Sequence, residues 1–315
     1  MLVRILGSAA GGGVPQWNCG CPVCDAARSG SRAVSRRRSS TIAVGDGAGE
    51  WFLGNAGPDL EASLRECPPL WPGLDDSTAP IHGVFLTDAE LDHTLGLLSL
   101  RQASELHVYA TAAVRVLLTC CGVLPTLESY TVVHWHEVRP GEGFALQYRH
   151  GATSPIWCEP FDASCDRLPR YARGNVSNGE ASNGGVSRSG VVIGYRITDQ
   201  NTTRSVVFLP SVAALDDDLL KHIAQANLVL VDGTFWTDDE LRARGRGTAT
   251  AHSMGHLPID GADGSLCLLR QLAEARVVYT HINNTNPMLF EDAPERAYLV
   301  GAGVSIAEDD AQYEL

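Results

Sequence analysis

Four side chains that can bind a metal or transfer a proton lie within one short segment at positions 88–93. Asp88, Glu90 and Asp92 occupy alternate positions after the apolar run 83–86, and His93 follows at once. Carboxylates and imidazoles are common protein ligands for divalent transition metals. The same acids could instead cap the first turn of a helix, with Asp88 as the N-cap. The segment taken alone leaves both interpretations open.

Two further apolar runs end in residues of the same kind. Asp232 follows the run 228–231, and His281 follows the run 276–280. Three strand ends that deliver Asp and His predict one metal site at one edge of a sheet. Its expected ligands are Asp92, His93 and His281, with Asp232 either as a ligand or as a residue that supports one.

Three cysteines form a second candidate metal site. Cys19, Cys21 and Cys24 lie within six residues, in sequence rich in Gly, Pro and Asn, where tight turns let thiolates converge on one tetrahedral zinc. Because zinc has no redox chemistry, we expect a structural role, with free thiols as the alternative. The chain has nine cysteines and no recognisable export signal, which favours thiols or metal ligands over disulfides.

Alternating strand-like and helix-like segments must position these residues. We expect an α/β fold with helices at 91–103, 112–122, 216–226 and 264–275. The expected strands are 4–6, 40–44, 51–55, 83–86, 107–110, 191–197, 205–209, 228–231 and 276–280. We further expect a single domain over residues 1–315, with a zinc-binding loop at 15–25 and a flexible expansion at about 166–190.

Composition narrows the classes of partner. At 315 residues and 44% hydrophobic content, the chain can bury a large core. Its net charge of −13 argues against nucleic acids and anionic membranes, which bind basic surfaces. The sequence has no apolar run near the ~18 residues that suggest a membrane span. We therefore expect a cytoplasmic protein with no nucleic-acid or membrane partner.

Several stretches carry a family resemblance. The run from Asp88 to His93 resembles the His-x-His-x-Asp-His signature of the metallo-β-lactamase fold, with acids at its first two histidine positions. More narrowly, the chain resembles the PqqB family of pyrroloquinoline quinone biosynthesis. The matching stretches are 6–13, 15–24, 55–59, 92–94, 231–240, 254–259 and 281–287.

The resemblance implies a four-layer αββα sandwich, whereas the pattern alone would also allow a three-layer α/β fold. It places Asp232 at the bridging aspartate of that fold and His281 at its last histidine ligand. His256 falls where related phosphodiesterases place a proton-donating histidine, and Ser211 falls where the fold usually has a third histidine. Asn284 falls where the related phosphodiesterase PhnP has a histidine as the fourth zinc ligand, so Asn284 is at most a weak ligand of the cysteine site.

The acids at 88 and 90 bear on the mechanism. With Asp88, Glu90 and Ser211 in place of three neutral ligands, two histidines and one carboxylate remain, a set that favours mononuclear iron(II) and oxygen chemistry. The PqqB resemblance implies iron- and dioxygen-dependent hydroxylation of a tyrosine derived from a precursor peptide. His256, Glu90 and Asp88 would then position a small peptide or tyrosine-containing substrate or exchange protons with it.

Two other functional classes stay open, namely a zinc metallohydrolase of the phosphodiesterase type and a non-catalytic carrier of a quinone or peptide. A homodimer is also left open.

Overall fold

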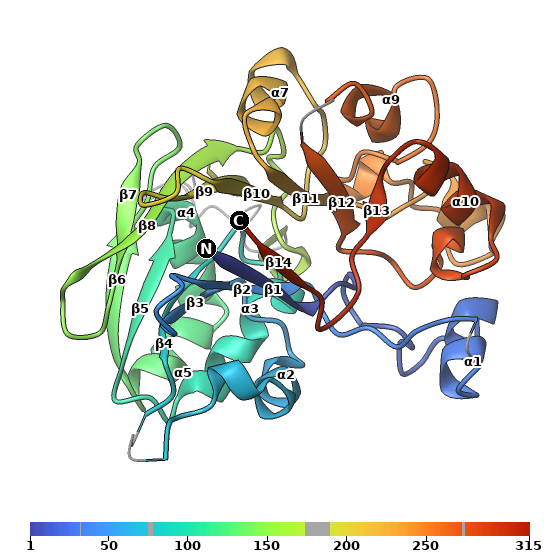
Figure 1. Ribbon diagram of the computed structural model, residues 1–315. Helices are drawn as coiled ribbons and strands as arrows, with labels where there is room; N and C mark the ends of the chain where they lie inside the picture. Colours follow the sequence, from blue (N-terminus) through green and yellow to red (C-terminus); the bar gives the residue numbers. More distant parts are fainter. Residues whose placement is uncertain (32, 75–77, 174–189, 273–274) are drawn as a thin grey trace.

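A computed structural model describes residues 1–315 except 32, 75–77, 174–189 and 273–274. The described residues form two mixed seven-stranded sheets that lie face to face (Figure 1). The N-terminal sheet has the order β14-β1-β2-β3-β4-β5-β6, and the C-terminal sheet has the order β13-β12-β11-β10-β9-β8-β7. The last strand, β14, returns to the N-terminal sheet beside β1, so the two chain ends lie close together.

The strands of the N-terminal sheet are β1 (Leu2–Gly7), β2 (Thr41–Gly45), β3 (Trp51–Gly54), β4 (Ile81–Phe85), β5 (Glu105–Ala110), β6 (Val132–Glu137) and β14 (Gln312–Glu314). Those of the C-terminal sheet are β7 (Phe144–Gln147), β8 (Thr153–Asp162), β9 (Ile193–Asp199), β10 (Ser205–Leu209), β11 (Leu228–Asp232), β12 (Arg276–Thr280) and β13 (Ser305–Ile306). Strands β3 to β6 and β10 to β13 pair in parallel, which places their carboxyl ends at a common edge of each sheet.

Helices cover the outer face of each sheet. Those on the N-terminal sheet are α2 (Leu60–Glu66), α4 (Ala112–Cys120) and α5 (Val123–Glu128), and those on the C-terminal sheet are α7 (Asp217–Ala224), α9 (Ser265–Leu269) and α10 (Pro294–Gly301). The described residues also form α1 (Pro22–Arg28), α3 (Leu91–Thr94) and α8 (Glu240–Ala243).

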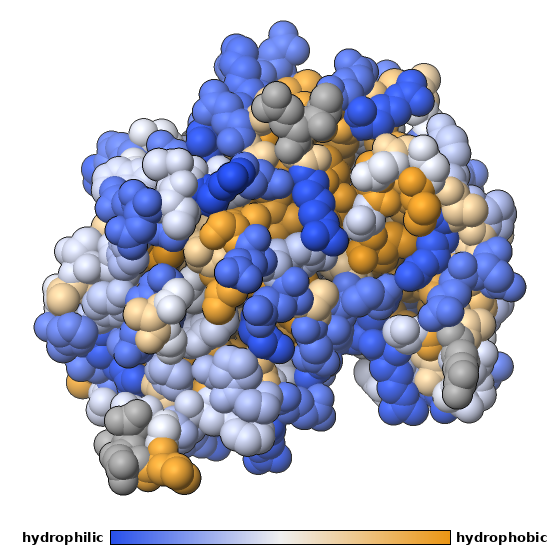
Figure 2. Space-filling model, viewed as in Figure 1, coloured by the Kyte–Doolittle hydropathy of each residue, from blue (hydrophilic) through white to orange (hydrophobic). Residues whose placement is uncertain are grey.

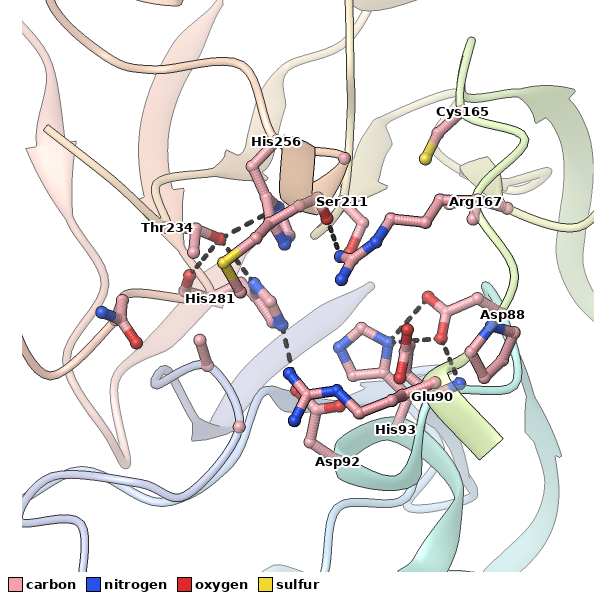
Figure 3. Close-up of a pocket in the computed structure, with 18 of the residues that line it drawn as sticks. Asp88, Glu90, Asp92, His93, Cys165, Arg167, Ser211, Thr234, His256 and His281 are labelled. Carbon is pink, nitrogen blue, oxygen red and sulfur yellow. Dashed lines mark hydrogen bonds and ion pairs between the residues drawn. The ribbon is translucent and has the colours of Figure 1, made fainter. Parts of the chain in front are cut away.

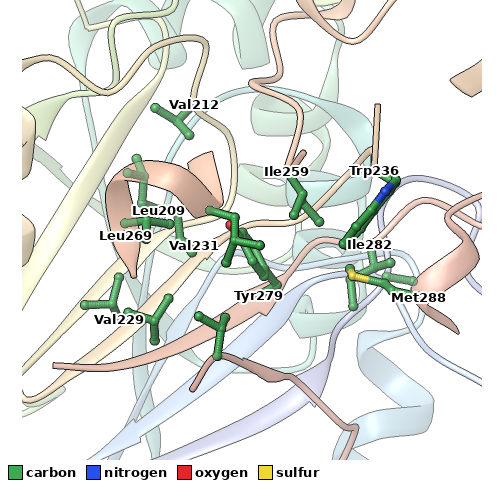
Figure 4. Packing of buried hydrophobic residues seen from close by; sticks show 14 of the residues in the cluster. Leu209, Val212, Val229, Val231, Trp236, Ile259, Leu269, Tyr279, Ile282 and Met288 are labelled. Atoms are coloured by element: carbon green, nitrogen blue, oxygen red, sulfur yellow. The ribbon is translucent and has the colours of Figure 1, made fainter. Parts of the chain in front are cut away.

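The hydrophobic core has three layers, one between the two sheets and one under the helices on each outer face. Strand β11 contributes to two of these layers. Leu228 and Leu230 of β11 pack between the two sheets, whereas Val229 and Val231 pack outward against the helices. Figure 4 shows this outer layer, with Leu269 of α9 close to Val229 and Val231. A strand buried on both faces reads as a continuous apolar run, as this one does. The expected four-layer αββα arrangement is therefore confirmed, and the three-layer alternative is wrong.

All nine expected strands are present, but the expected helix at 91–103 is wrong in its extent. The chain forms α3 at Leu91–Thr94 and then a 3₁₀ segment at Leu95–Leu100. The His93 carbonyl accepts a hydrogen bond of 2.7 Å from Ala56 N, and Gly96 N donates to the Ala56 carbonyl. A Cβ at Gly96 would lie 2.1 Å from the Gly57 carbonyl oxygen, so close approach of the loop after β3 breaks the regular α-helix here.

The expected loop at 15–25 needs correction, and the expected expansion at 166–190 is described only in part. The expected loop at 15–25 ends in a helix, because α1 begins at Pro22 and Cys21 serves as its N-cap. Of the expected expansion at 166–190, residues 174–189 lie outside the described residues. The described part contains a short 3₁₀ turn, Arg170–Ala172.

None of the described helices combines the length and the apolar character required to cross a membrane. Figure 2 shows mostly hydrophilic residues on one face, interrupted by an apolar region across its upper middle.

Candidate metal centre

The ends of strands from both sheets meet around one cavity of about 240 Å³ (Figure 3). The loop after β4 brings acids and a histidine to it, and the segments after β10, β11 and β12 bring the other side chains. The prediction of a site at the edge of one sheet is thus wrong, because β4 belongs to the N-terminal sheet and β11 and β12 to the other. The expected site residues that line the cavity are Asp88, Glu90, Asp92, His93, Ser211, His256 and His281.

His93 is buried, and Asp88 fixes the orientation of its ring. Its Nδ1 lies 2.7 Å from Asp88 Oδ2 and 2.9 Å from Asp88 Oδ1. Asp88 is held in turn by the Thr87 hydroxyl and by the Glu90 backbone N–H. The opposite nitrogen, His93 Nε2, is buried and has no hydrogen-bond partner among the described residues. A buried ring nitrogen without a partner is costly, and a metal ion is one group that would satisfy it.

Electrostatics around His93 favour a cation. Burial lowers the pKa of His93, but the Asp88 and Asp92 carboxylates outweigh burial and raise it to about 9. Burial likewise opposes ionisation of Asp92, yet His93 and His281 lower its pKa below the ordinary value. The cluster of Asp88, Asp92 and His93 therefore stabilises its carboxylates in the ionised form and a positive charge beside them.

His281 follows β12 in a left-handed backbone conformation, with φ of 55°. Such a conformation is uncommon for residues other than glycine and is often found at functional sites. Its Nδ1 lies 2.8 Å from Thr234 Oγ1, and its Nε2 lies 3.2 Å from Asp92 Oδ2. Thr234 Oγ1 is also 2.6 Å from Asp232 Oδ1. If the hydroxyl donates to Asp232, it can accept from His281 Nδ1–H, which leaves Nε2 free to bind a metal.

Asp232 is fully buried and faces His256. Its Oδ2 lies 2.7 Å from His256 Nδ1 and accepts from Val212 N, while Oδ1 accepts from the backbone N–H and the hydroxyl of Thr234. Four protein donors thus occupy the two oxygens. This geometry favours the supporting role for Asp232 over that of a ligand, and it orients His256 at the cavity wall.

Around this cavity, the ligand-type atoms of the described residues form two clusters, and His281 belongs to both. In the first, ligand atoms of Asp92, His93 and His281 lie within 4.8 Å of one another, and in the second the same holds for Asp232, His256 and His281. The first cluster contains the unpartnered His93 Nε2 and offers the expected two-histidine, one-carboxylate set. These residues fit a divalent metal with open positions toward the cavity.

Glu90 lines the same cavity without joining either cluster. Burial, together with Asp88 and Asp92, raises its pKa. A carboxyl group that holds its proton more readily can exchange one with a ligand in the cavity.

The three cysteines converge as their spacing predicts. Sulfur atoms of Cys19, Cys21 and Cys24 lie within 4.8 Å of one another. The Asn284 side-chain amide lies 3.3 Å from Cys24 Sγ and 3.8 Å from Cys21 Sγ. The Asn284 amide therefore donates to the sulfur atoms, and no contact identifies it as a fourth ligand. Asn284 follows His281 by three residues, so one short loop touches both sites.

Among the cavity residues that sequence reasoning did not assign to the site are Thr234, Cys165 and Arg167. Thr234 lies two positions after Asp232, where a search for hydroxyls beside the strand end would have found it. Cys165 and Arg167 come from the irregular segment after β8, whose sequence has no periodicity or ligand spacing to indicate a site.

Comparisons with known proteins identify the family and the fold. Residues 50–282 match the family model described as a beta-lactamase superfamily domain. The coenzyme PQQ synthesis protein B of Cupriavidus necator is 39% identical over 317 residues, which cover 99% of each chain. The crystal structure of Zn²⁺-bound PqqB from Methylobacterium extorquens aligns over 100% of both chains, with a TM-score of 0.88 and 33% identity.

A diphosphatase from the PhnP family shares the fold, with a TM-score of 0.67, 18% identity and coverage of 100% of this chain and 97% of that one. The metallo-β-lactamase fold and the resemblance to PqqB sequences are thus confirmed.

Proposed function

The chain belongs to the PqqB family within the β-lactamase superfamily, and from that premise we propose that it is an iron(II)- and dioxygen-dependent hydroxylase. Its substrate is a tyrosine derived from a precursor peptide, in the synthesis of pyrroloquinoline quinone or a related peptide-derived product. The name of the relatives, coenzyme PQQ synthesis protein B, supports the pathway.

One observation carries the proposal at the level of chemistry. His93 Nε2 is buried and unpartnered among the described residues, beside Asp92 and His281 in a cluster of ligand-type atoms. Two imidazoles and one carboxylate are the donor set that suits iron(II) with positions left for other molecules. Bound iron(II) would supply the dioxygen chemistry that amino-acid side chains lack.

The chain itself orients the ligand atoms. Asp88 holds His93 through Nδ1, and Thr234 holds His281 through Nδ1, so each ring keeps Nε2 for the metal. Such outer contacts fix the tautomer and the direction of the ring. On this assignment, Asp88 acts through His93 and has no direct contact with the substrate.

His256 and Glu90 are the groups that exchange protons with the substrate. The Asp232 carboxylate fixes the Nδ1 proton of His256, which leaves Nε2 as a proton acceptor. Glu90, with its raised pKa, provides a second group that can hold or release a proton in the same cavity. A phenol that loses its proton becomes more electron-rich, so a base near its hydroxyl assists oxidation of the ring.

A zinc metallohydrolase is the second candidate, and two observations favour it. The related structure from Methylobacterium extorquens is described as Zn²⁺-bound, and the second cluster around His281 could hold another ion. Against a two-metal site, both oxygens of Asp232 already accept hydrogen bonds from protein donors. We therefore favour the mononuclear site.

Labelled dioxygen distinguishes the two functions. The full chain is reconstituted with iron(II) without oxygen, its metal content is measured, and it is then exposed to ¹⁸O₂ with tyrosine-containing peptides and a chemical reductant. The reductant supplies the two electrons that convert the second oxygen atom to water. We expect one bound iron, the absorption of a nitrosyl adduct when nitric oxide is added to a separate sample without oxygen, and label in the tyrosine ring. A hydrolase takes its oxygen from water, so two bound zinc ions and His93-dependent phosphodiester cleavage without label would overturn the hydroxylase.

A further inference from the structure

Arg167 reaches the cavity with an incomplete set of hydrogen bonds. The residue lies in the irregular segment between β8 and the turn at Arg170–Ala172, and Figure 3 shows its side chain extending into the cavity. Its Nη1 donates to the Met254 carbonyl. Its Nε is buried and has no hydrogen-bond partner within the described parts of the chain. A buried charged donor left unpaired is among the more costly defects of a folded protein.

The side chain is held in place by packing. A Cβ added at Gly255 would lie 3.1 Å from Arg167 Cδ and 3.0 Å from Cys165 Sγ, so the stem of Arg167 lies directly on that backbone. Gly255 has φ of 83°, which an L side chain rarely adopts. The glycine therefore makes room for the arginine, and the guanidinium is positioned before any ligand arrives.

The acids around the cavity form no ion pair with Arg167 among the described residues. Asp88 bonds His93, Asp92 bonds His281 and Asp232 bonds His256, which leaves Glu90 as the acid without a histidine partner. Glu90 lines the same cavity, yet among the described residues no ion pair within 4.0 Å joins it to Arg167. Burial and the neighbouring Arg173 lower the pKa of Arg167, and Glu90 opposes this shift only in part.

The unpaired edge has the shape of an anion-binding fork. On a guanidinium, Nε–H and one Nη2–H point the same way and match the two oxygens of a carboxylate. Because Nη1 is already bonded to Met254, the Nε–Nη2 edge is the one left for a ligand.

We propose that Arg167 binds a carboxylate of the substrate through this edge and so determines which tyrosine derivatives are accepted. The inference rests on the proposed function for the identity of the substrate. A carboxylate fixed on Arg167 holds the remainder of the molecule between Arg167 and the ligand cluster, where His93 and His281 lie on the opposite wall (Figure 3). Arg167 thus selects substrates with a free acid group over neutral analogues.

A matched pair of probes tests the proposal without turnover. The acid 3-(4-hydroxyphenyl)propanoate and its primary amide have nearly the same shape, and they differ in charge. Binding of each is measured by calorimetry on the zinc-loaded full chain. For one charge-assisted bidentate contact, we expect the acid to bind about 10- to 100-fold more tightly than the amide.

Three variants locate the source of that preference. Arg167→Met should abolish it, and Arg167→Lys should retain part of it, since lysine keeps the charge and loses the fork. Arg101→Met is the control, because Arg101 is exposed, donates to the Leu98 carbonyl and does not line this cavity. Metal content and thermal unfolding are compared for all three variants, so that misfolding is recognised.

The outcomes separate this proposal from the proposed function. Equal preference for the acid in wild type and Arg167→Met would place the carboxylate on the metal and overturn the role of Arg167, as would failure of the wild type to bind the acid. Arg167-dependent preference without ¹⁸O incorporation would keep the proposal and overturn the hydroxylase. Incorporation of label without an Arg167-dependent preference for the acid would keep the hydroxylase and overturn the role of Arg167.

Discussion

Asp88 Oδ2 lies 2.7 Å from His93 Nδ1, and both side chains are almost completely buried. The same distance joins Asp232 Oδ2 and His256 Nδ1 on the opposite side of the cavity. Each sheet thus provides one carboxylate that orients one imidazole. In the proposed mechanism, the first pair serves the metal and the second pair serves proton transfer.

The first prediction concerns Asp88. Asp88→Ala should weaken iron(II) binding about 10- to 100-fold, because an unsupported His93 loses its tautomer and its direction. Competition with a chelator of known affinity measures the effect. The control is Asp238→Ala, which removes an exposed carboxylate 2.7 Å from His252 Nδ1 and should leave affinity unchanged. Unchanged affinity in Asp88→Ala would show that His93 does not need this contact or is not a ligand.

The second prediction compares two histidines of the cavity. His93→Ala should abolish both metal binding and turnover, whereas His256→Ala should keep the metal and lower turnover about 100-fold or more, as expected for loss of a general base. Metal analysis and single-turnover kinetics on the same samples separate the two effects. Loss of the active-site metal from His256→Ala would instead assign His256 to a metal site.

The third prediction concerns the cysteine cluster. Replacing Cys21 and Cys24 by serine should release about one equivalent of zinc and lower the Tm, because a metal that binds the folded chain alone stabilises it. Cys120→Ser, at an exposed cysteine outside the cluster, is the control. Zinc retained by the double variant would contradict the assignment. Asn284→Ala then tests whether the amide contributes to affinity.

The fourth prediction is a pH dependence that originates at Glu240. Burial raises its pKa to about 7, although Thr285 and the Trp236 backbone N–H stabilise its ionised form. The folded chain therefore binds a proton at Glu240 that the unfolded chain has already released. This contribution to the free energy of unfolding is present at low pH and is lost as pH rises from about 4.5 to about 7, on the order of 3 kcal/mol.

Denaturant unfolding of wild type and Glu240→Gln across pH 5–8 measures this effect as a difference between the two proteins. The free energy of unfolding of wild type minus that of Glu240→Gln should fall by about that amount as pH rises. At alkaline pH the variant should therefore gain stability relative to wild type. Glu128→Gln, at an exposed position of α5, should show no such change relative to wild type. A pH-independent difference for Glu240→Gln would show that Glu240 has an ordinary pKa.

The sequence alone identified those residues of the two candidate sites that a local pattern marks, such as a strand end or a close spacing of cysteines. Apolar runs mark β11 and β12, so Asp232 and His281 could be placed at strand ends without a structure. The cysteine spacing likewise predicted that Cys19, Cys21 and Cys24 converge, because three residues so close along the chain can meet through turns. These predictions depend on neighbours within a few residues, which the sequence records directly.

The tertiary structure decided which of these residues touch each other. Asp232 and His256 are 24 positions apart, and His281 and Asp92 are 189 positions apart, so their contacts exist because two sheets pack face to face and open at the same end. The same packing broke the expected helix at 91–103, since Ala56 N takes the His93 carbonyl that a continuous helix would use. It also brought Arg167 into the cavity from an irregular segment. Contacts between distant segments depend on the geometry of the whole fold, which no local pattern of residues encodes.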